Sequence, residues 1–134
     1  MEEAVYVGGC LCGAVRYEAR GAPMNVRVCH CRLCQKATGA PFFARALFPR
    51  DAVTITGPVI EYNSSASLRR VSCAVCGARL FARSDTAPPR VGIGLATLDD
   101  PEALAPTEHI FVSRRLPWVR FDDGLAEYPE RSPA

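Results

Sequence analysis

The sequence predicts a mostly β protein with one short helix. Proline accounts for 11 of the 134 residues, above the usual share of about 5%, and proline favours turns and short strands over long helices. Short segments that alternate apolar and polar residues recur along the chain. The chain is 49% apolar, which is enough for a core and argues against a disordered protein. We expect a single domain over residues 1–134, because domains of about 100–200 residues are typical.

Each expected element follows from a local pattern. In residues 14–19, Val15, Tyr17 and Ala19 fall on one face of a strand. Residues 53–56 and 59–62 are strand-like and flank Gly57-Pro58, a spacing that predicts a hairpin. Only residues 31–38 have a helical pattern, with Gly39 in a C-cap position. Further strands are expected at 42–48, 68–73, 80–83, 91–98 and 109–112.

The start of the chain and its apolar segments predict a cytoplasmic location. Met1-Glu2-Glu3 is acidic where a secretory signal would be basic. No apolar run approaches the roughly 18 residues of a membrane span. In the cytoplasm thiols stay reduced, so the seven cysteines require a role other than disulfide formation. They are clustered in three motifs: Cys10-x-Cys12, Cys29-x-Cys31-x-x-Cys34 and Cys73-x-x-Cys76. We expect these motifs to bind metal.

Net charge predicts no nucleic-acid partner. The formal charge is +2 with cysteine counted as neutral. Seven thiolates and two zinc ions would together add −3, for a net charge of about −1. A strongly basic surface is therefore not expected.

Seven cysteines divide into a group of four and a group of three. Cys12 and Cys76 are each followed by glycine, which allows the tight turns that aim backbone N–H groups at a metal-bound thiolate. We therefore assign Cys10, Cys12, Cys73 and Cys76 to one structural zinc, which would close a loop of about sixty residues. The alternative is that these four are buried thiols without a metal.

The remaining three cysteines predict an open zinc site. In an extended segment Cys29 and Cys31 face one side and His30 the other, and Cys31 and Cys34 share one face of a short helix. A zinc with three protein ligands and a free position is typical of catalysis, although three thiolates leave the centre with a net charge of −1. The alternatives are a second structural zinc completed by His30 or His109, and a redox pair formed by Cys31 and Cys34. His30 is also the candidate catalytic proton carrier.

Several motifs resemble the glutathione-dependent formaldehyde-activating enzyme family, over about residues 5–128. The later stretch of residues 94–101, His109 and Pro117-Trp118 fit the same pattern. The three cysteine segments that carry the resemblance are Gly8-Gly-Cys-Leu-Cys-Gly-Ala-Val-Arg-Tyr17, Cys29-His-Cys-Arg-Leu-Cys-Gln-Lys-Ala-Thr-Gly-Ala-Pro41 and Cys73-Ala-Val-Cys-Gly-Ala-Arg-Leu80.

The resemblance implies a β-tent of small antiparallel sheets held by a four-cysteine zinc, with a second zinc on the Cys-His-Cys-x-x-Cys segment. It implies an enzyme that joins glutathione and formaldehyde into S-hydroxymethylglutathione and cleaves the same carbon–sulfur bond. The chain has Leu125-Ala126 where the family has Leu-Pro. The resemblance therefore does not fix which thiol is the substrate. The family also includes the zinc domain of centromere protein V, so the alternative is a non-catalytic module that binds protein or RNA.

The expected function is therefore a zinc-dependent carbon–sulfur lyase or synthase with a small thiol and an aldehyde, or their adduct, as partners. We expect two zinc ions per chain and allow for a homodimer. Ser64 and Ser65 are expected in an ordinary turn. Strand alternation lets only one of Arg69 and Arg70 face the site, and exposure to solvent is expected for either. Two aromatic residues, Phe42 and Trp118, are candidates to line the pocket, although buried aromatic residues are more often part of the core.

Overall fold

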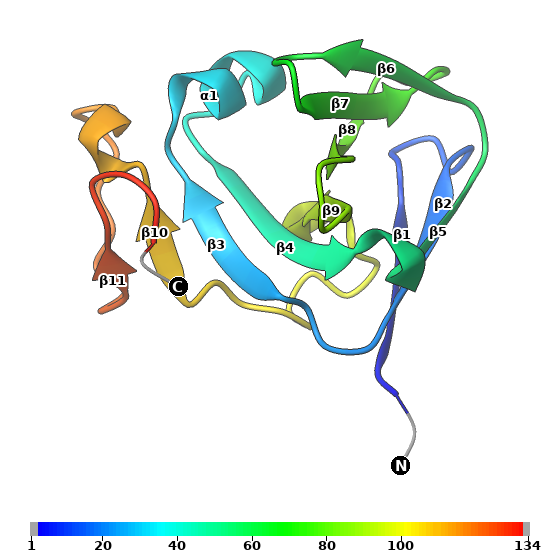
Figure 1. The fold of residues 1–134 in the computed structure, drawn as a ribbon, viewed down its shortest axis with the longest axis horizontal. Coiled ribbons are helices and arrows are strands. Elements are labelled where there is room, and N and C mark those ends of the chain that lie inside the picture. Colours follow the sequence, from blue (N-terminus) through cyan, green and yellow to red (C-terminus); the bar gives the residue numbers. More distant parts are fainter. Residues whose placement is uncertain (1–2, 133–134) are drawn as a thin grey trace.

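Two β-sheets form the frame of the protein. The computed structural model describes residues 3–132. One sheet has three strands in the order β1-β2-β5, and the other has eight in the order β11-β10-β3-β4-β9-β8-β7-β6. Figure 1 shows the three-stranded sheet on the right and the helix α1 at the upper left. The expected mostly β fold with one α-helix is confirmed for the described residues.

The strands are short, as the sequence predicts. Their bounds are β1 (Val5–Gly9), β2 (Arg16–Arg20), β3 (Asn25–Cys29), β4 (Phe43–Pro49), β5 (Val53–Thr56), β6 (Val59–Asn63), β7 (Leu68–Cys73), β8 (Arg79–Ser84), β9 (Arg90–Gly94), β10 (Glu108–Ile110) and β11 (Ala126–Glu127). The helices are α1 (Arg32–Thr38) and the 3₁₀ turns η1 (Arg50–Ala52), η2 (Leu95–Thr97) and η3 (Val112–Arg114). Neighbouring strands are antiparallel, except that β10 runs parallel to both β3 and β11.

The alternation predicted around β2 is confirmed. Val15, Tyr17 and Ala19 are all buried, at 0%, 3% and 0% exposure. In the sheet Tyr17 pairs with Ile55 and Ala19 with Val53 of β5. This apolar face of the small sheet contacts residues of the large sheet in one core.

The predicted hairpin of residues 53–62 is wrong. β5 pairs with β2 in the small sheet, and β6 pairs with β7 in the large sheet. Gly57, with φ of 105°, lies between them, and a Cβ there would overlap the carbonyl group of Ala14. The chain therefore crosses from one sheet to the other at this point. Local turn chemistry did not reveal this, because the partners of both strands come from elsewhere in the sequence.

Two strand predictions were too long. β9 ends at Gly94 and continues as η2, and β10 ends at Ile110 just before η3. Thr97 in η2 donates its hydroxyl to the carbonyl of Gly94 at 2.7 Å, which favours the turn over an extended chain. The strands β1, β3 and β11 were not among the predicted strands.

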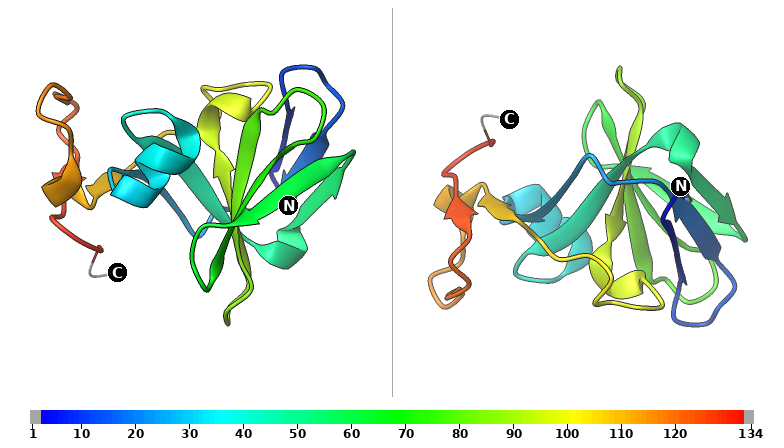
Figure 2. Two further views of the ribbon diagram at one scale, coloured as in Figure 1. Left: turned by 90° about the horizontal axis from the view of Figure 1, so that it is seen from above. Right: turned by 90° about the horizontal axis from the view of Figure 1, so that it is seen from below.

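The helix is close to its predicted bounds. Cys31 is the N-cap, and its sulfur accepts a hydrogen bond from the Cys34 N–H. Gly39 has the left-handed φ of 70° and donates its N–H to the carbonyl of Gln35 at 2.8 Å. These caps limit α1 to seven residues. Figure 2 shows α1 and the C-terminal segment on one side of the central strands β7 to β9, and the small sheet on the other.

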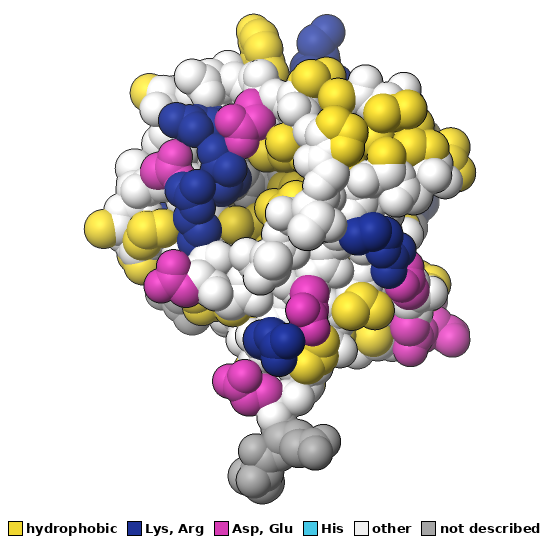
Figure 3. Space-filling view, turned by 90° about the vertical axis from the view of Figure 1, so that its right-hand side faces the viewer, with side chains coloured by type: hydrophobic (Ala, Val, Ile, Leu, Met, Phe, Trp, Pro, Cys, Tyr) yellow, Lys and Arg dark blue, Asp and Glu magenta, His cyan; other side chains and the backbone are white. Residues whose placement is uncertain are grey.

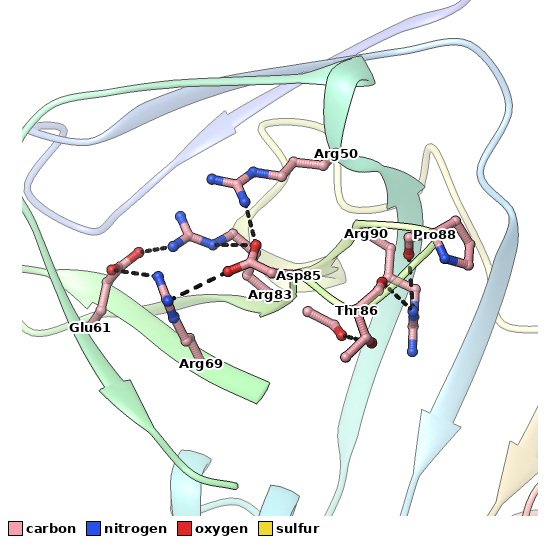
Figure 4. Close-up of polar contacts among 9 residues, drawn as sticks. Arg50, Glu61, Arg69, Arg83, Asp85, Thr86, Pro88 and Arg90 are labelled. Atoms are coloured by element: carbon pink, nitrogen blue, oxygen red, sulfur yellow. Dashed lines mark hydrogen bonds and ion pairs between the residues drawn. The ribbon is translucent and has the colours of Figure 1, made fainter. Parts of the chain in front are cut away.

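An ionic network joins strands β6 to β8 with η1. Glu61 accepts from Arg83 at 2.7 Å, and Arg69 lies 3.6 Å from Asp85, which also pairs with Arg50. Figure 4 shows these side chains converging between the two sheets. Figure 3 shows basic and acidic side chains close together on the face that includes the small sheet.

Candidate active site

The seven cysteines form two sulfur clusters. In the first, Cys10 and Cys12 lie in the loop between β1 and β2, Cys73 ends β7, and Cys76 lies in the turn that follows. The four sulfur atoms lie within 4.8 Å of one another. Cys12 Sγ is 3.6 Å from Cys10 Sγ and 3.9 Å from Cys73 Sγ, which is 61 residues away in the chain. The structure thus brings together the four cysteines that the sequence spacing grouped.

Backbone N–H groups point at these sulfurs. The Val15 N–H donates to Cys10 Sγ at 3.2 Å, and the Cys76 N–H donates to Cys73 Sγ at 3.4 Å. The bond from Val15 is the main reason why the pKa of Cys10 is lowered to about 6. A sulfur that carries negative charge more easily is a better metal ligand.

The geometry of this cluster fits a tetrahedral zinc ion. Zinc–sulfur bonds of about 2.3 Å place neighbouring sulfurs roughly 3.8 Å apart, and the Cys10–Cys12 and Cys12–Cys73 separations are close to that value. Gly13 and Gly77, which follow Cys12 and Cys76, have φ values of 82° and 77°. Left-handed backbone favours glycine, as the sequence pattern predicted.

The second cluster is built where β3 ends and α1 begins. Cys29 is the last residue of β3, Cys31 caps the helix, and Cys34 lies within it. Cys34 Sγ is 3.4 Å from Cys29 Sγ, and the three sulfurs lie within 4.8 Å of one another. Cys29 and Cys34 are buried, at 5% and 7% exposure. These distances also fit three ligands of one zinc ion.

The three thiols change each other's pKa values. Hydrogen bonds with Cys29 and Cys34 lower the pKa of Cys31 to about 2. The hydrogen bond with Cys31, then the one with Cys34, and burial of the thiol all raise the pKa of Cys29. The cluster therefore favours a thiolate at Cys31, and an electron-rich sulfur group of this kind suits a soft or borderline cation.

Three protein donors are all that the described residues supply to this cluster. Within residues 3–132, no histidine, carboxylate or fourth cysteine brings a ligand atom into the three-sulfur group. His30 and His109, both considered as the fourth ligand, instead contact each other, with His30 Nε2 3.0 Å from His109 Nδ1. The described residues therefore give this cluster three sulfur donors.

A hydrogen-bonded chain connects these two histidines to Asp123. The carboxylate of Asp123 accepts from His109 Nε2–H at 2.8 Å. His109 Nδ1 is then the acceptor for His30 Nε2–H, which leaves His30 Nδ1 as an acceptor that is buried without a partner. Burial lowers the pKa of His30 to about 4. Asp123 lies in a coil segment, where no sequence pattern pointed to this contact.

The aromatic residues near His30 differ from the sequence prediction. Phe42 and Phe121 pack on the His30 ring, with ring centroids 5.9 and 5.6 Å away. Trp118 is 69% exposed. Neither Phe42 nor Trp118 lines the cavity beside the three cysteines, so the structure does not support a pocket role for these two candidates. A residue type alone does not show which side of a loop its ring occupies.

Arg70 faces the three cysteines, and Arg69 does not. The two terminal nitrogens of Arg70 each lie 3.7 Å from Cys34 Sγ, and its Nε donates to Ser64 Oγ at 3.1 Å. Arg70 is 5% exposed, so the expectation that it faces solvent is wrong. Ser64 lies in the predicted turn but also holds this guanidinium.

A cavity of about 310 Å³ adjoins the three cysteines. Its wall includes all three sulfur residues, Ser65 and the apolar residues Leu68 and Ile110. No aspartate or glutamate is among the described residues that line it. The basic lining residues are Arg45, Arg70, Arg90 and Arg131. The arrangement combines a thiol cluster with a positively charged space that is large enough for a small molecule.

No helix within residues 3–132 is both long and apolar enough to cross a bilayer.

Comparisons with known proteins agree with the geometry. A protein from Schizosaccharomyces pombe described as an uncharacterized lyase is 32% identical over 76 residues, which cover 57% of this chain and 56% of that protein. A Penicillium rubens protein, provisionally named a glutathione-dependent formaldehyde-activating enzyme, is 30% identical over 99 residues, 66% of this chain and 50% of that protein. The chain thus spans about half the length of the curated relatives it matches.

A solved structure and a family model give the remaining comparisons. The crystal structure of a Rhodobacter sphaeroides protein has a TM-score of 0.58 at 21% identity, over 91% of this chain and 98% of that chain, which supports the fold. The model of the glutathione-dependent formaldehyde-activating enzyme family matches residues 5–114, which contain both sulfur clusters. With that match over most of its length, the chain belongs to the glutathione-dependent formaldehyde-activating enzyme family.

Proposed function

We propose that this protein is a zinc-dependent carbon–sulfur lyase, also able to work as a synthase, that acts on a thiol–aldehyde adduct such as S-hydroxymethylglutathione. The observation that carries the proposal is the three-cysteine cluster in the wall of a cavity, without a fourth protein donor in residues 3–132. A catalytic zinc keeps one position for a ligand, whereas a structural zinc is closed by four protein donors. Family membership supports the same class of reaction.

We assign the two clusters to two zinc ions with different roles. Cys10, Cys12, Cys73 and Cys76 would hold the structural ion, and Cys29, Cys31 and Cys34 the second one. A zinc ion at the second cluster would supply a lowered pKa for an incoming thiol and keep its sulfur near the three cysteines. The protein contributes a partly apolar cavity, with Leu68 and Ile110 in its wall, that limits access of water.

The reaction balances without an oxidant or a reductant. In the synthetic direction the S–H bond of the thiol and the π bond of the carbonyl break, a bond forms between sulfur and the carbonyl carbon, and the proton ends on the carbonyl oxygen. Cleavage reverses these steps. The arginine-lined cavity suits glutathione, because arginine forms bidentate hydrogen bonds with carboxylates and glutathione carries two of them.

His30 is our candidate for the residue that carries the proton, and this role stays a prediction. Its support is the unpartnered Nδ1 of a fully buried ring, although His30 is not among the residues that line the cavity. With a pKa of about 4 the ring is neutral near pH 7 and can accept a hydrogen bond. We expect His30→Gln to lower kcat about 100-fold with the second zinc still bound. Unchanged kcat in that variant would remove His30 from the mechanism.

The function is tested with purified protein that contains two zinc ions per chain. The protein is given a set of thiol–aldehyde adducts, including S-hydroxymethylglutathione, and the released aldehyde is measured. We expect turnover of at least one adduct by the wild type and none by Cys34→Ser. Failure of the two-zinc protein to cleave any adduct would contradict the proposal and favour a zinc-stabilised module that binds protein or RNA.

Location and assembly are part of the same proposal. We place the reaction in the cytoplasm, because a reducing compartment keeps seven thiols available for metal binding. A homodimer stays a prediction, and light scattering of the zinc-loaded protein would test it.

A further inference from the structure

The charge of the three-cysteine cluster poses a problem for the proposed function. Three thiolates around one zinc ion carry a net charge of −1, and an incoming thiolate would raise it to −2. Repulsion between like charges in a partly buried site is strong, because the effective dielectric constant there is well below that of water. A positive group of the protein close to the cluster would therefore favour the binding of a fourth sulfur.

Arg70 is placed to provide this compensation. Both terminal nitrogens lie at the same 3.7 Å distance from Cys34 Sγ, so the guanidinium faces the sulfur with two donors. The third nitrogen, Nε, is held by Ser64 Oγ at 3.1 Å. The side chain is therefore fixed on both sides, and its 5% exposure leaves little water to screen its charge.

Arg70 also differs from its neighbour in what balances its charge. Arg69 lies within ion-pair distance of Glu61 and Asp85 (Figure 4). For Arg70 no carboxylate is within that distance in the part of the chain that the structure describes. The cysteine sulfurs are the groups that can balance it. A buried arginine that is paired with a sulfur cluster in place of a carboxylate points to a role in that cluster.

A second arginine reinforces the positive field of the cavity. Arg45 lines the same space and donates to Asn25 Oδ1 at 2.6 Å, a neutral partner. Burial lowers its pKa from the usual value, but arginine stays charged near pH 7. The described lining holds no carboxylate, so the cysteine sulfurs are the acidic groups on the cavity wall that face this charge.

We propose that Arg70 is the positioning residue that holds Cys34 and supplies the positive charge by which the three-cysteine site accepts an anionic sulfur from outside the protein. The inference rests on the metal site of the proposed function. The inference also gives that site a ligand selectivity, because Arg70 favours a thiolate over a neutral ligand of the same metal. With Arg70 included, the site is neutral before the thiolate binds, and a single negative charge remains afterwards.

The test compares two ligands on the cobalt-loaded protein. Cobalt(II) replaces zinc, and sulfur-to-cobalt charge-transfer absorption reports each added thiolate. Glutathione is the anionic sulfur probe and imidazole is the neutral probe. The variants are Arg70→Gln, which removes the charge, Arg70→Lys, which keeps the charge without the two-pronged donor, and Arg69→Gln as the matched control on the opposite face. Metal content and circular dichroism verify that each variant is folded.

The proposal predicts a selective effect. We expect Arg70→Gln to weaken glutathione binding about ten- to a hundredfold and to leave imidazole binding within about threefold, since only the thiolate interacts with the charge. Arg70→Lys should recover part of the loss, and Arg69→Gln should match the wild type.

Three results would overturn it. One is equal glutathione affinity in Arg70→Gln and the wild type. Another is an equal loss for glutathione and imidazole, which would make Arg70 a purely structural residue. The third is loss of the metal ion of the three-cysteine cluster from both Arg70→Lys and Arg70→Gln. These results do not depend on turnover, so a protein that cleaves no adduct can still show the selective loss, and the two proposals fail separately.

Discussion

Cys34 and Cys76 occupy similar places in the two sulfur clusters, but they cross-link very different lengths of chain. The cluster of Cys76 joins residues 61 positions apart, whereas Cys34 lies five residues from Cys29. A cross-link over about sixty residues removes about 4 kcal/mol of unfolded-state entropy, and one over about six residues removes about 2 kcal/mol. Substitution of Cys76 should therefore lower the stability of the fold more than substitution of Cys34.

We expect Cys76→Ser to lower the free energy of unfolding by about 4 kcal/mol or more, because it opens the longer loop and disrupts four-ligand binding. Cys34→Ser should keep the fold and lose one of two zinc ions. Urea unfolding and metal analysis measure both effects. Equal destabilisation by the two variants would show that the three-cysteine cluster is structural.

Tyr17 provides a second test at the residue scale. Thr97 donates its hydroxyl to Gly94, so the Tyr17 hydroxyl donates to Thr97 Oγ1 at 2.7 Å. Burial raises the pKa of Tyr17 to about 12. Tyr17→Phe should cost about 1 kcal/mol of stability, as measured by urea unfolding. Tyr62→Phe, at a position that is 71% exposed, is the control and should cost nothing measurable.

At the scale of elements, the crossing between β5 and β6 depends on Gly57. Its φ of 105° and the nearby carbonyl of Ala14 exclude a side chain. Gly124 also has a positive φ, at 71°, but open space surrounds it. The comparison separates backbone strain, which both positions share, from crowding, which only Gly57 has.

Gly57→Ala should therefore lower the free energy of unfolding by about 3 kcal/mol, and Gly124→Ala by about 1 kcal/mol. Thermal or urea unfolding of both variants measures the difference. Similar values for the two would indicate that the crossing segment moves away from Ala14 without cost.

The loop that carries Asp123 is attached to β10 through His109, and His109 in turn holds His30. This order of donors places a proton on Nε2 of each ring, with His109 Nδ1 as the acceptor between them. Since the pKa of His30 is lowered to about 4, its ring should remain neutral at pH 6, where an ordinary histidine is largely protonated. Long-range ¹H–¹⁵N spectra report this directly. A proton on His30 Nδ1 at pH 6 would contradict the arrangement.

At the scale of the whole molecule, β7 connects both clusters. Cys73 at its end belongs to the four-cysteine cluster, and Arg70 within it contacts Cys34 of the other cluster. The strand also lies between β6 and β8 of the large sheet (Figure 1). Damage to the four-cysteine site should thus spread to the second site, whereas loss of the second metal should leave the sheets in place.

A chelator titration of the zinc-loaded protein tests this order. We expect the zinc ion of the three-cysteine cluster to leave first, with little change in circular dichroism, because three ligands hold an ion less tightly than four. Loss of the remaining zinc, at the four-cysteine cluster, should coincide with unfolding. Release of both ions in one step, together with the fold, would contradict independent roles for the two clusters.

The sequence predicted much of the local structure for identifiable reasons. Alternation placed Val15, Tyr17 and Ala19 in the core, and Gly39 ended the only α-helix in residues 3–132. Cysteine spacing divided the sulfurs into the two groups that the structure shows. The extent of a single domain over residues 1–134 stays a prediction.

Other features depended on partners that are distant in sequence. Arg70 and Arg69 are chemically identical, and alternation showed only that they point in opposite directions. Which of them faces Cys34 was decided by how β7 packs in the large sheet. Likewise Asp123 contacts His109 because a coil returns to β10, and no periodicity marks such a contact.

The amino-acid sequence alone determined the position of α1 and of several strands, the core face of β2 and the composition of the two sulfur clusters, because these follow from residue type and short spacing. Only the tertiary structure decided the crossing at Gly57, the contact of His30 with His109 and the charge that surrounds Cys34. Those features arise from strand pairing and burial, and both depend on which distant segments meet when the chain folds.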